Sequence, residues 1–239
     1  MESGAAAANS LPLSWREGVI TLIYKGKGLP RPSLSSYRPI SLLQCDYKLV
    51  CKAVSNRLQP ALDYLIDPLQ TAFISGRDIR DNTLYHLALA EWVRHSQQPA
   101  ALIILDIEKA YDRVHRPWLY RVAEAMGFGQ HTQRWLRLLT SDGSCRVVVN
   151  GHRSAPFPVR NGLQQGSTLS PVLWVMQLEP LTSYLHHLRS TNALSTPTLP
   201  NNVPAPPVTH HADDTVLTVS NVDRDGEVAT AAVQLFFSQ

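Results

Sequence analysis

The spacing of hydrophobic and polar residues predicts a chain that mixes strands with helices. Runs rich in apolar and β-branched residues predict strands at residues 15–24, 38–43 and 101–106. A hairpin is predicted around Asn150-Gly151, because these residues readily adopt the positive φ angles of a two-residue turn. A second hairpin is predicted at residues 208–219, where an extended segment, a turn and an alternating run follow one another. We therefore expect an α+β fold.

Helices are predicted between the strands by apolar residues that recur three or four positions apart. Residues 47–65 form the first of them, and Pro60 is expected to kink or split it. Residues 170–188 begin with Ser170-Pro171, a cap residue followed by proline at the first helical position, and Pro180 is expected to kink this helix. The apolar face of the first helix is expected to hold Leu49, Val50, Ala53, Val54, Leu58 and Leu62, and the other helices span residues 78–95, 117–126, 131–140 and 226–237.

Three aspartates stand at the ends of predicted strands. Asp106 closes the apolar run 101–105, a pattern typical of a buried strand, and Asp213 and Asp214 lie at the tip of the 208–219 hairpin. If both elements share a sheet, the β-carbons of Asp106 and Asp213 come within about 4.5–5.5 Å of each other. Carboxylates at that distance raise one another's proton affinity, and a divalent cation with oxygen ligands relieves the repulsion. The residues alone therefore indicate metal-dependent phosphoryl transfer, in which two ions hold the attacking and leaving oxygens.

Composition excludes several classes of protein but does not identify a binding partner. The chain has 239 residues and a net charge of +3, so whole-chain charge neither requires nor excludes a polyanionic partner. Its three cysteines are an odd number without CxxC spacing, which argues against a disulfide framework and against a zinc site. No signal-peptide pattern opens the chain, and no apolar run is long enough for a membrane span. We expect an intracellular protein, in the nucleus or the cytoplasm, that is not secreted and has no membrane partner.

Several segments, in the right order, resemble the motifs of one enzyme family. Residues 105–114 (LDIEKAYDRV), 162–171 (GLQQGSTLSP) and 212–214 (ADD) resemble motifs A, B and C of reverse transcriptases. Upstream, residues 22–28 (LIYKGKG), 37–43 (YRPISLL) and 70–82 (QTAFISGRDIRDN) resemble the fingers segments of the LINE-type, non-LTR retrotransposon enzymes. The resemblance covers the chain from about Trp15 to its end.

The resemblance implies a polymerase-type fold of fingers and palm. It assigns residues 15–239 to one reverse transcriptase domain, with fingers at about 15–100 and a partial palm at about 101–239. An antiparallel palm sheet is expected to be backed by helices, and the thumb is expected to be absent, as in a fragment of a mobile-element polyprotein. Residues 1–14 are expected to be disordered and residues 190–207 to be a variable surface loop.

The same resemblance implies roles for the acidic residues. Asp106, Asp213 and Asp214 are the expected catalytic residues and metal ligands, and the backbone carbonyl of Ile107 is a further expected ligand. The expected cofactor is a pair of Mg²⁺ ions, with Mn²⁺ as an alternative. His210 and His211 lie beside these aspartates, but they lack a second ligand pair at helical spacing, which argues against a transition-metal site.

Five further residues are expected to bind the dNTP. Tyr111 falls at the family's steric-gate position, where an aromatic ring presses on the sugar and excludes a 2′-OH. Gln165 and Gly166 are expected to line the dNTP and template pocket, and glycine allows close backbone approach. Lys25 and Arg38 match fingers cations that hold the triphosphate, for which the planar Arg guanidinium is well suited.

A few positions depart from the family pattern or stay open. His211 stands where the family usually has a bulky residue such as Phe or Tyr, and Thr168 replaces a common proline of motif B. Neither change removes an expected metal ligand. For Lys27 and Arg77, a phosphate contact and an ordinary solvated charge are equally expected.

The function implied by the resemblance is RNA-directed DNA polymerisation, in which a nucleotidyltransferase extends a DNA primer on an RNA template with dNTPs. Two alternatives are kept. One is an inactive or repurposed truncated remnant that binds nucleic acid without polymerising. The other is a different two-metal enzyme such as a nuclease, which would leave Tyr111 and the Gln165-Gly166 pair unexplained.

Overall fold

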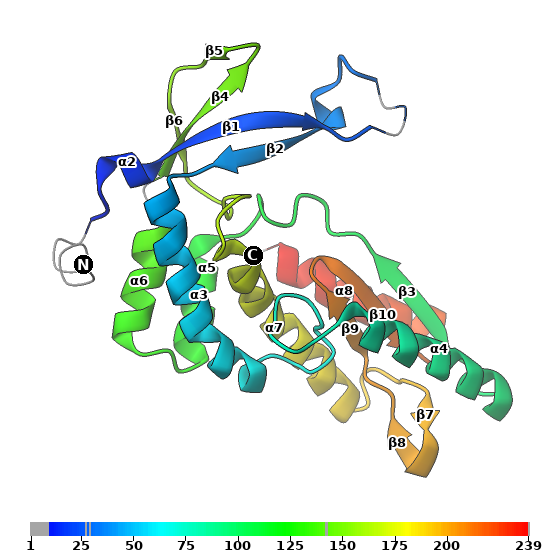
Figure 1. The fold of residues 1–239 in the computed structure, drawn as a ribbon. Coiled ribbons are helices and arrows are strands. Elements are labelled where there is room, and N and C mark those ends of the chain that lie inside the picture. The colour runs from blue at the N-terminus through cyan, green and yellow to red at the C-terminus, as the bar shows by residue number, and fades with distance from the viewer. Residues whose placement is uncertain (1–9, 27, 29, 142, 239) are drawn as a thin grey trace. The chain divides into compact units, whose positions relative to one another are not determined.

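The computed structural model describes residues 10–26, 28, 30–141 and 143–238, and Figure 1 shows the ribbon. The chain divides into two compact units. The first unit combines residues 1–58 with 111–174, and the second combines residues 59–110 with 175–239. Residues 1–9 of the segment predicted to be disordered lie outside the described residues, and the rest of that segment already includes the start of helix α2 (Leu13–Arg16).

A sheet organises the first unit. Its strands are β1 (Glu17–Tyr24), β2 (Tyr37–Leu42), β4 (Gly143–Val149), β5 (His152–Arg153) and β6 (Phe157–Val159), in the order β2-β1-β4-β5 with β6 also pairing with β4. Strand β1 is antiparallel to β2 and parallel to β4. Asn150 and Gly151 join β4 to β5 with φ angles of 50° and 80°, so the predicted turn is confirmed. The short 3-10 helix η1 (Leu34–Ser36) precedes β2.

The helices follow the predicted pattern closely in extent. The first unit contains α5 (Arg116–Ala125) and α6 (Gln130–Thr140), and α3 (Cys45–Leu65) and α7 (Ser170–Ser190) begin in it and continue into the second. Both α3 and α7 run through their prolines, so neither is split. The predicted apolar face of α3 was wrong in part, since Leu49 is 69% exposed. The buried stripe contains polar Ser55, which an apolar-only pattern misses; its members are Tyr47, Cys51, Ser55, Leu58 and Leu62.

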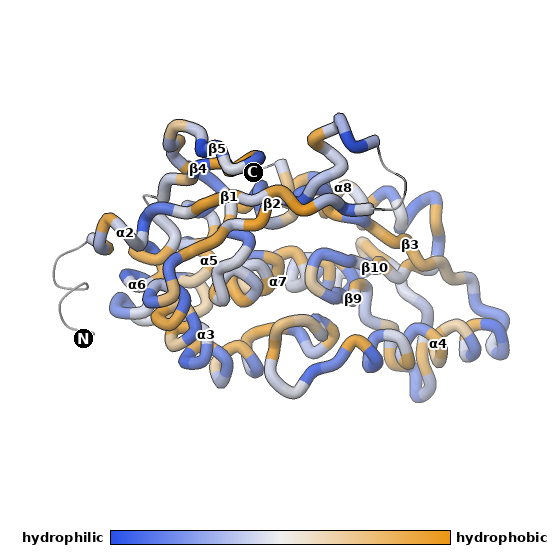
Figure 2. The backbone as a smooth tube through the Cα atoms, turned by 45° about the horizontal axis from the view of Figure 1, so that its top comes forward, coloured by the Kyte–Doolittle hydropathy of each residue, from blue (hydrophilic) through white to orange (hydrophobic). Residues whose placement is uncertain are grey.

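The second unit is built on a three-stranded antiparallel sheet. Its order is β3 (Ala101–Leu105), β10 (Asp214–Val219) and β9 (Val208–His211). The hydrophobic run of β3 is visible as an orange segment in Figure 2. Strand alternation turns one face of the sheet toward α7 and α8 (Glu227–Phe237). The core on that face consists of Leu178, Leu181, Leu185, Leu194, Val208, Leu217, Val219, Ala229 and Ala232, with Ala101, Ile103 and Leu105 packed against it.

The remaining elements of the second unit frame this sheet. Helix α4 (Ile79–Ser96) starts with a capping box, in which Asp78 accepts from the backbone N–H of Arg80 and Asp81 accepts from that of Asp78. The π-helix η3 (Val222–Gly226) precedes α8.

Two expectations for the second unit need correction. Strand β3 is not fully buried, because it is an edge strand with one uncovered face, where Leu102 is 42% and Ile104 is 78% exposed. The segment 190–207 is not a plain surface loop. Its short ribbon of β7 (Thr198–Leu199) and β8 (Val203–Pro204), flanking η2 (Pro200–Asn202), is tied down by buried Leu194 and Ala205.

Candidate active site

The Ala212-Asp213 turn presents the acidic pair. Strands β9 and β10 pair up to His211 and Asp214, which leaves only Ala212 and Asp213 as turn residues. Ala212 has a φ of 58°, the left-handed conformation that the favoured two-residue hairpin turns require at this position. For an L-residue with a β-carbon this conformation costs about 1–2 kcal/mol. The surrounding structure must therefore hold the turn in place.

Asp106 comes to the same end of the sheet. The registered pairing of β3 with β10 ends at Leu105 and Thr215, so Asp106 and Asp214 are the next residues along the two neighbouring strands. Leu105 packs on the core, and strand alternation places the two aspartates on the opposite face. Asp106 and Asp214 are exposed and Asp213 is half-buried. The structure therefore brings the three predicted carboxylates to the same end of the sheet.

These carboxylates suit a hard divalent cation by their chemistry. Carboxylate and backbone carbonyl oxygens are the ligands that Mg²⁺ prefers, and Ile107 adds a carbonyl directly after Asp106. Within the described part of the chain, no Lys or Arg side chain pairs with Asp106, Asp213 or Asp214. Among the same residues, no three His, Cys, Asp or Glu side chains already converge on one point. Binding therefore requires the three side chains to turn toward one another.

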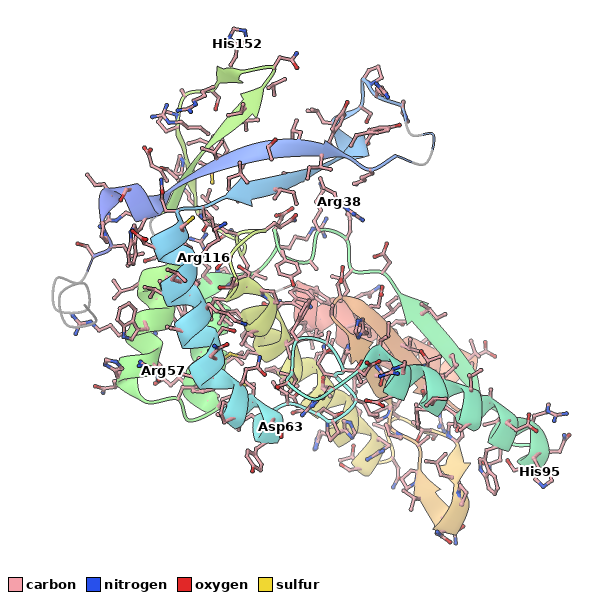
Figure 3. All side chains as sticks on the ribbon, viewed as in Figure 1. Arg38, Arg57, Asp63, His95, Arg116 and His152 are labelled. Carbon is pink, nitrogen blue, oxygen red and sulfur yellow. The ribbon has the colours of Figure 1, made fainter. Side chains whose placement is uncertain are left out.

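The predicted dNTP-binding residues all lie in the first unit. Arg38 is exposed on β2 and is labelled in Figure 3, and Lys25 follows β1 with its Nζ 2.7 Å from the Ser35 carbonyl oxygen. The Tyr111 ring stacks on Trp174, with centroids 5.9 Å apart and an interplanar angle of 22°. Lys27 lies outside the described residues.

Gln165 and Gly166 are joined to strand β2. The backbone N–H of Ser41 donates to the Gln165 carbonyl oxygen at 2.8 Å. Gly166 has a φ of 125°, and a β-carbon added there would overlap the Ser41 carbonyl oxygen. A cavity of about 110 Å³ lies beside this contact, lined by residues that include Ile20, Ser41, Asn161, Gln164 and Gln165. The close backbone approach at Gly166 is to strand β2. Its predicted place in the dNTP and template pocket stays a prediction.

Arg116 holds the segment before Gln165, a role that no sequence pattern predicts. Its side chain is almost fully buried, and Figure 3 labels it. Its Nε and Nη1 atoms each donate at 3.0 Å, to the carbonyl oxygens of Gly162 and Val159. The N–H of Leu163 also donates to the Tyr111 carbonyl oxygen at 2.8 Å. Backbone hydrogen bonds therefore join the segments of Tyr111 and Gln165.

Arg77 proves to be a structural cation. Its side chain is 12% exposed. The guanidinium donates to the backbone carbonyl oxygens of Asp63, Ile66, Asp67 and Gln70, at distances between 2.6 and 3.1 Å. The solvated charge expected as one alternative is therefore wrong.

His210 is a buried structural histidine. Its Nδ1 lies 2.9 Å from Thr215 Oγ1 and its Nε2 lies 3.1 Å from Thr182 Oγ1, so both ring nitrogens are engaged. Burial disfavours the charged ring and lowers the pKa of His210 to about 4. His211 is engaged as well, with Nδ1 3.1 Å from Thr71 Oγ1. Hydroxyl groups of threonines thus contact both histidines.

A half-buried acidic pair, Asp67 and Glu179, lies in the same unit. Burial raises the pKa of Glu179 to about 7, although its Oε2 accepts the backbone N–H of Asp67 at 3.0 Å. Burial alone would also raise the pKa of Asp67. The His186 ring, 3.1 Å from its carboxylate, and the N–H of Leu69 outweigh burial and lower it.

Residues 25–239 match a protein family described as reverse transcriptase (RNA-dependent DNA polymerase). The chain belongs to the reverse transcriptase family. Reverse transcriptases generally use divalent metal ions, and the oxygen-rich edge formed by Asp106, Asp213 and Asp214 is compatible with that chemistry. In the part of this chain that the structure describes, no helix has the length and hydropathy to cross a membrane.

The relatives of this reverse transcriptase chain come from mobile elements. An uncharacterised 149 kDa protein of transposon TX1 from Xenopus laevis is 34% identical over 212 residues, covering 89% of this chain and 16% of that protein. The Pol polyprotein of retrotransposable element R2 from Popillia japonica is 26% identical over 212 residues, covering 88% and 28%. The RNA-directed DNA polymerase of the mobile element jockey from Drosophila melanogaster is 28% identical over 165 residues, covering 68% and 18%. The chain therefore spans less than a third of each relative, and the predicted non-LTR resemblance is confirmed.

Solved telomerase structures share the fold. The telomerase of Candida albicans, in complex with a TWJ fragment of telomeric RNA, aligns with a TM-score of 0.65 over 97% of this chain and 42% of its own, at 14% identity. Apo telomerase from Candida tropicalis aligns with a TM-score of 0.60 over 91% and 41%, at 13% identity. The predicted α+β fold of polymerase type is confirmed by these alignments.

Proposed function

We propose that this chain is the core of an RNA-directed DNA polymerase, which extends a DNA primer on an RNA template with dNTPs. One observation carries the proposal. Asp106 and the Asp213-Asp214 pair, which lie in the segments that resemble motifs A and C of the family, come together at one end of a sheet in the second unit. The proposal extends to this chain an activity that the jockey relative bears in its name.

The proposed metal ligands are the carboxylates of Asp106, Asp213 and Asp214 and the backbone carbonyl of Ile107. Two Mg²⁺ ions, or Mn²⁺ in their place, would supply charge stabilisation to the attacking 3′-oxygen and the leaving oxygen of phosphoryl transfer. The aspartates would contribute their charge and hold the ions. Asp106 and Asp214 are exposed at the end of the sheet, which leaves them open to a nucleic-acid end.

The proposed dNTP-binding residues would contact different parts of the dNTP. Arg38 and Lys25 would bind the triphosphate, and Arg38 would do so with two parallel hydrogen bonds. The Tyr111 ring would exclude a 2′-OH, and its stacking on Trp174 favours one ring position. Gln165 and Gly166 would line the pocket for the dNTP and the template. The contact with Ser41 keeps their backbone close to β2.

A domain assignment follows from the same proposal. The fingers would comprise residues from about 15 to 100, and the partial palm those from about 101 to 239. All four proposed metal ligands then belong to the palm.

The test is primer extension on an RNA template with the purified chain, Mg²⁺ and dNTPs. Asp106→Asn and Asp213→Asn are each expected to lower kcat by at least about 100-fold, the scale on which losing one electrostatic stabiliser slows a reaction. Asp223→Asn is the matched control, because Asp223 is an exposed aspartate on η3, outside the proposed site. Equal extension by Asp213→Asn and the wild type would contradict the proposal. RNA binding without extension by the wild type would favour the non-polymerising remnant, and Mg²⁺-dependent cleavage without dNTPs would favour a nuclease.

A further inference from the structure

A short segment outside the proposed site adds to the sheet of the second unit. Gln70 forms a parallel bridge with His210 on β9, which is the edge strand opposite β3. The N–H of His210 donates to the Leu69 carbonyl oxygen at 2.9 Å, and the N–H of Thr71 donates to the His210 carbonyl oxygen at 3.0 Å. Residues 69–71 thus lie along the strand that ends in the acidic turn.

The side chain of Gln70 reaches the turn itself. Its Oε1 accepts the backbone N–H of Ala212 at 3.2 Å and that of Ala72 at 3.0 Å. Both partners are donors, so the amide oxygen must face them and the orientation of the amide is determined. Ala212 is the residue with the left-handed φ, directly before Asp213. The hydrogen bond therefore joins Gln70 to Ala212, the turn residue with the positive φ angle.

The surroundings of Gln70 make it a fixed support. Its side chain is almost fully buried, with the residue 2% exposed. Asn82 Nδ2 donates to the carbonyl oxygens of both Leu69 and His210, at 3.1 and 2.8 Å, and so joins the segment to the strand a second time. Arg77 Nη1 donates to the carbonyl oxygen of Gln70 at 3.1 Å. A buried side chain on a segment held from two sides can restrain the turn.

We propose that Gln70 is a positioning residue for the Ala212-Asp213 turn, acting through its hydrogen bond to the Ala212 N–H. By holding this backbone, it would keep the two carboxylates at the sheet edge where Asp106 lies. The catalytic consequence rests on the proposed polymerase function. The structural consequence, restraint of the Ala212 backbone, does not.

The chain offers well-matched variants for a test. Gln70→Met keeps the length and apolar stem of the side chain and removes the acceptor. Gln70→Glu keeps an acceptor oxygen and replaces Nε2, which has no hydrogen-bond partner in the described part of the chain, with the second oxygen of a carboxyl group that burial keeps protonated. Gln59→Met is the control, because the Gln59 amide also bonds to backbone groups, donating to the Phe73 carbonyl oxygen and accepting the Ser75 N–H, away from the turn.

The first readout is independent of catalysis. In protein labelled with ¹⁵N-alanine, the Ala212 amide is identified by its absence from an Ala212→Gly variant, and its hydrogen exchange is measured. Gln70→Met is expected to speed exchange at Ala212 by at least about fivefold, as loss of one hydrogen bond implies. Gln70→Glu and Gln59→Met are expected to leave the rate within about twofold of the wild type. Unchanged exchange in Gln70→Met would overturn the proposal.

The second readout follows the carboxylates. Mn²⁺ binding, measured by electron paramagnetic resonance, is expected to weaken several-fold in Gln70→Met and to recover in Gln70→Glu. In primer extension, Gln70→Met is expected to lower kcat while the KM for dNTP stays close to the wild-type value, because Gln70 is buried and is not among the proposed dNTP-binding residues. Full kcat in a Gln70→Met protein with fast Ala212 exchange would refute the catalytic part alone.

A measurement on the wild type covers the case in which Gln70→Met does not fold. A scalar coupling between the Ala212 amide nitrogen and the Gln70 side-chain carbonyl carbon reports the hydrogen bond directly. Its absence, with the Ala212 amide protected, would overturn the proposal. If the wild-type chain extends no primer, the proposed function fails, while the exchange rates and this coupling still decide the role of Gln70.

Discussion

The backbone N–H of Ser41 donates to the carbonyl oxygen of Gln165 at 2.8 Å, and this hydrogen bond brings two distant parts of the first unit together. The next residue, Gly166, lies so close that its Cα faces the Ser41 carbonyl oxygen without room for a β-carbon. The strand that carries Arg38 and the segment that carries Gln165 are therefore held at a fixed backbone separation. A glycine is what makes this separation attainable.

Gly166→Ala is expected to destabilise the chain by more than about 3 kcal/mol, because it combines a steric overlap with a left-handed φ. Gly151→Ala is the matched control. Gly151 also has a positive φ, of 80°, but no atom lies within 4 Å of an added β-carbon, so a loss of about 1 kcal/mol is expected. Urea unfolding of the three proteins measures the difference. Equal losses for the two variants would show that the Ser41 contact is not the cause.

Arg77→Lys is expected to destabilise the second unit by about 2–3 kcal/mol. A lysine keeps the charge but cannot fork between several carbonyl oxygens, so buried acceptors lose their donors. Arg80→Lys is the control, because the Arg80 side chain is 81% exposed and pairs only with Asp78 nearby. The test is the difference in unfolding free energy. A loss in Arg77→Lys no larger than that in Arg80→Lys would contradict the structural role of Arg77.

Burial of His210 predicts a loss of stability in acid. Its folded pKa, about 4, lies below the ordinary 6.5, so the unfolded chain binds more protons between these pH values. Stability from this group is complete above about pH 6.5 and is lost as the pH falls toward 4, on the order of 3 kcal/mol in total. Subtracting the unfolding free energy of His210→Gln from that of the wild type at each pH isolates the effect. A difference that does not change with pH would refute it.

Glu179 predicts the opposite trend. Its folded pKa, about 7, lies above the ordinary 4.5, so the folded chain binds more protons in this window and loses stability as the pH rises through it. Relative to Glu179→Gln, the wild type is expected to lose on the order of 3 kcal/mol between pH 4.5 and pH 7. The His210 and Glu179 trends oppose each other up to pH 6.5. Either variant alone is therefore expected to show a steeper pH dependence there than the wild type.

Local signals in the sequence predicted much of the fold. Asn150-Gly151 and Asp78 determine a turn and a helix start through their own backbone and side-chain chemistry, so both were predicted well. The buried face of α3 and the exposed face of β3 depend on which elements pack against them. The hydrophobic pattern of Leu49 or Ile104 alone does not contain that information.

The residues of the candidate site also differ in whether their roles can be predicted from local sequence. Asp106, Asp213 and Asp214 were identified because each stands at the end of a strand and inside a short motif. Gln70 and Arg116 act through backbone groups far away in sequence, at Ala212 and at Gly162. A glutamine or arginine that bonds to distant backbone has no spacing rule. The signal for Gln70 was its place in the segment that resembles the family, although no role followed from that.

Strand β3 carries a practical consequence for handling the isolated chain. In the sheet of the second unit it is an edge strand, and it exposes Ile104 and Leu102 beside its unpaired backbone groups. Such an edge can take up the same strand of another molecule. At high protein concentration the purified chain is therefore expected to aggregate, and a lysine in place of Ile104 would keep it dispersed.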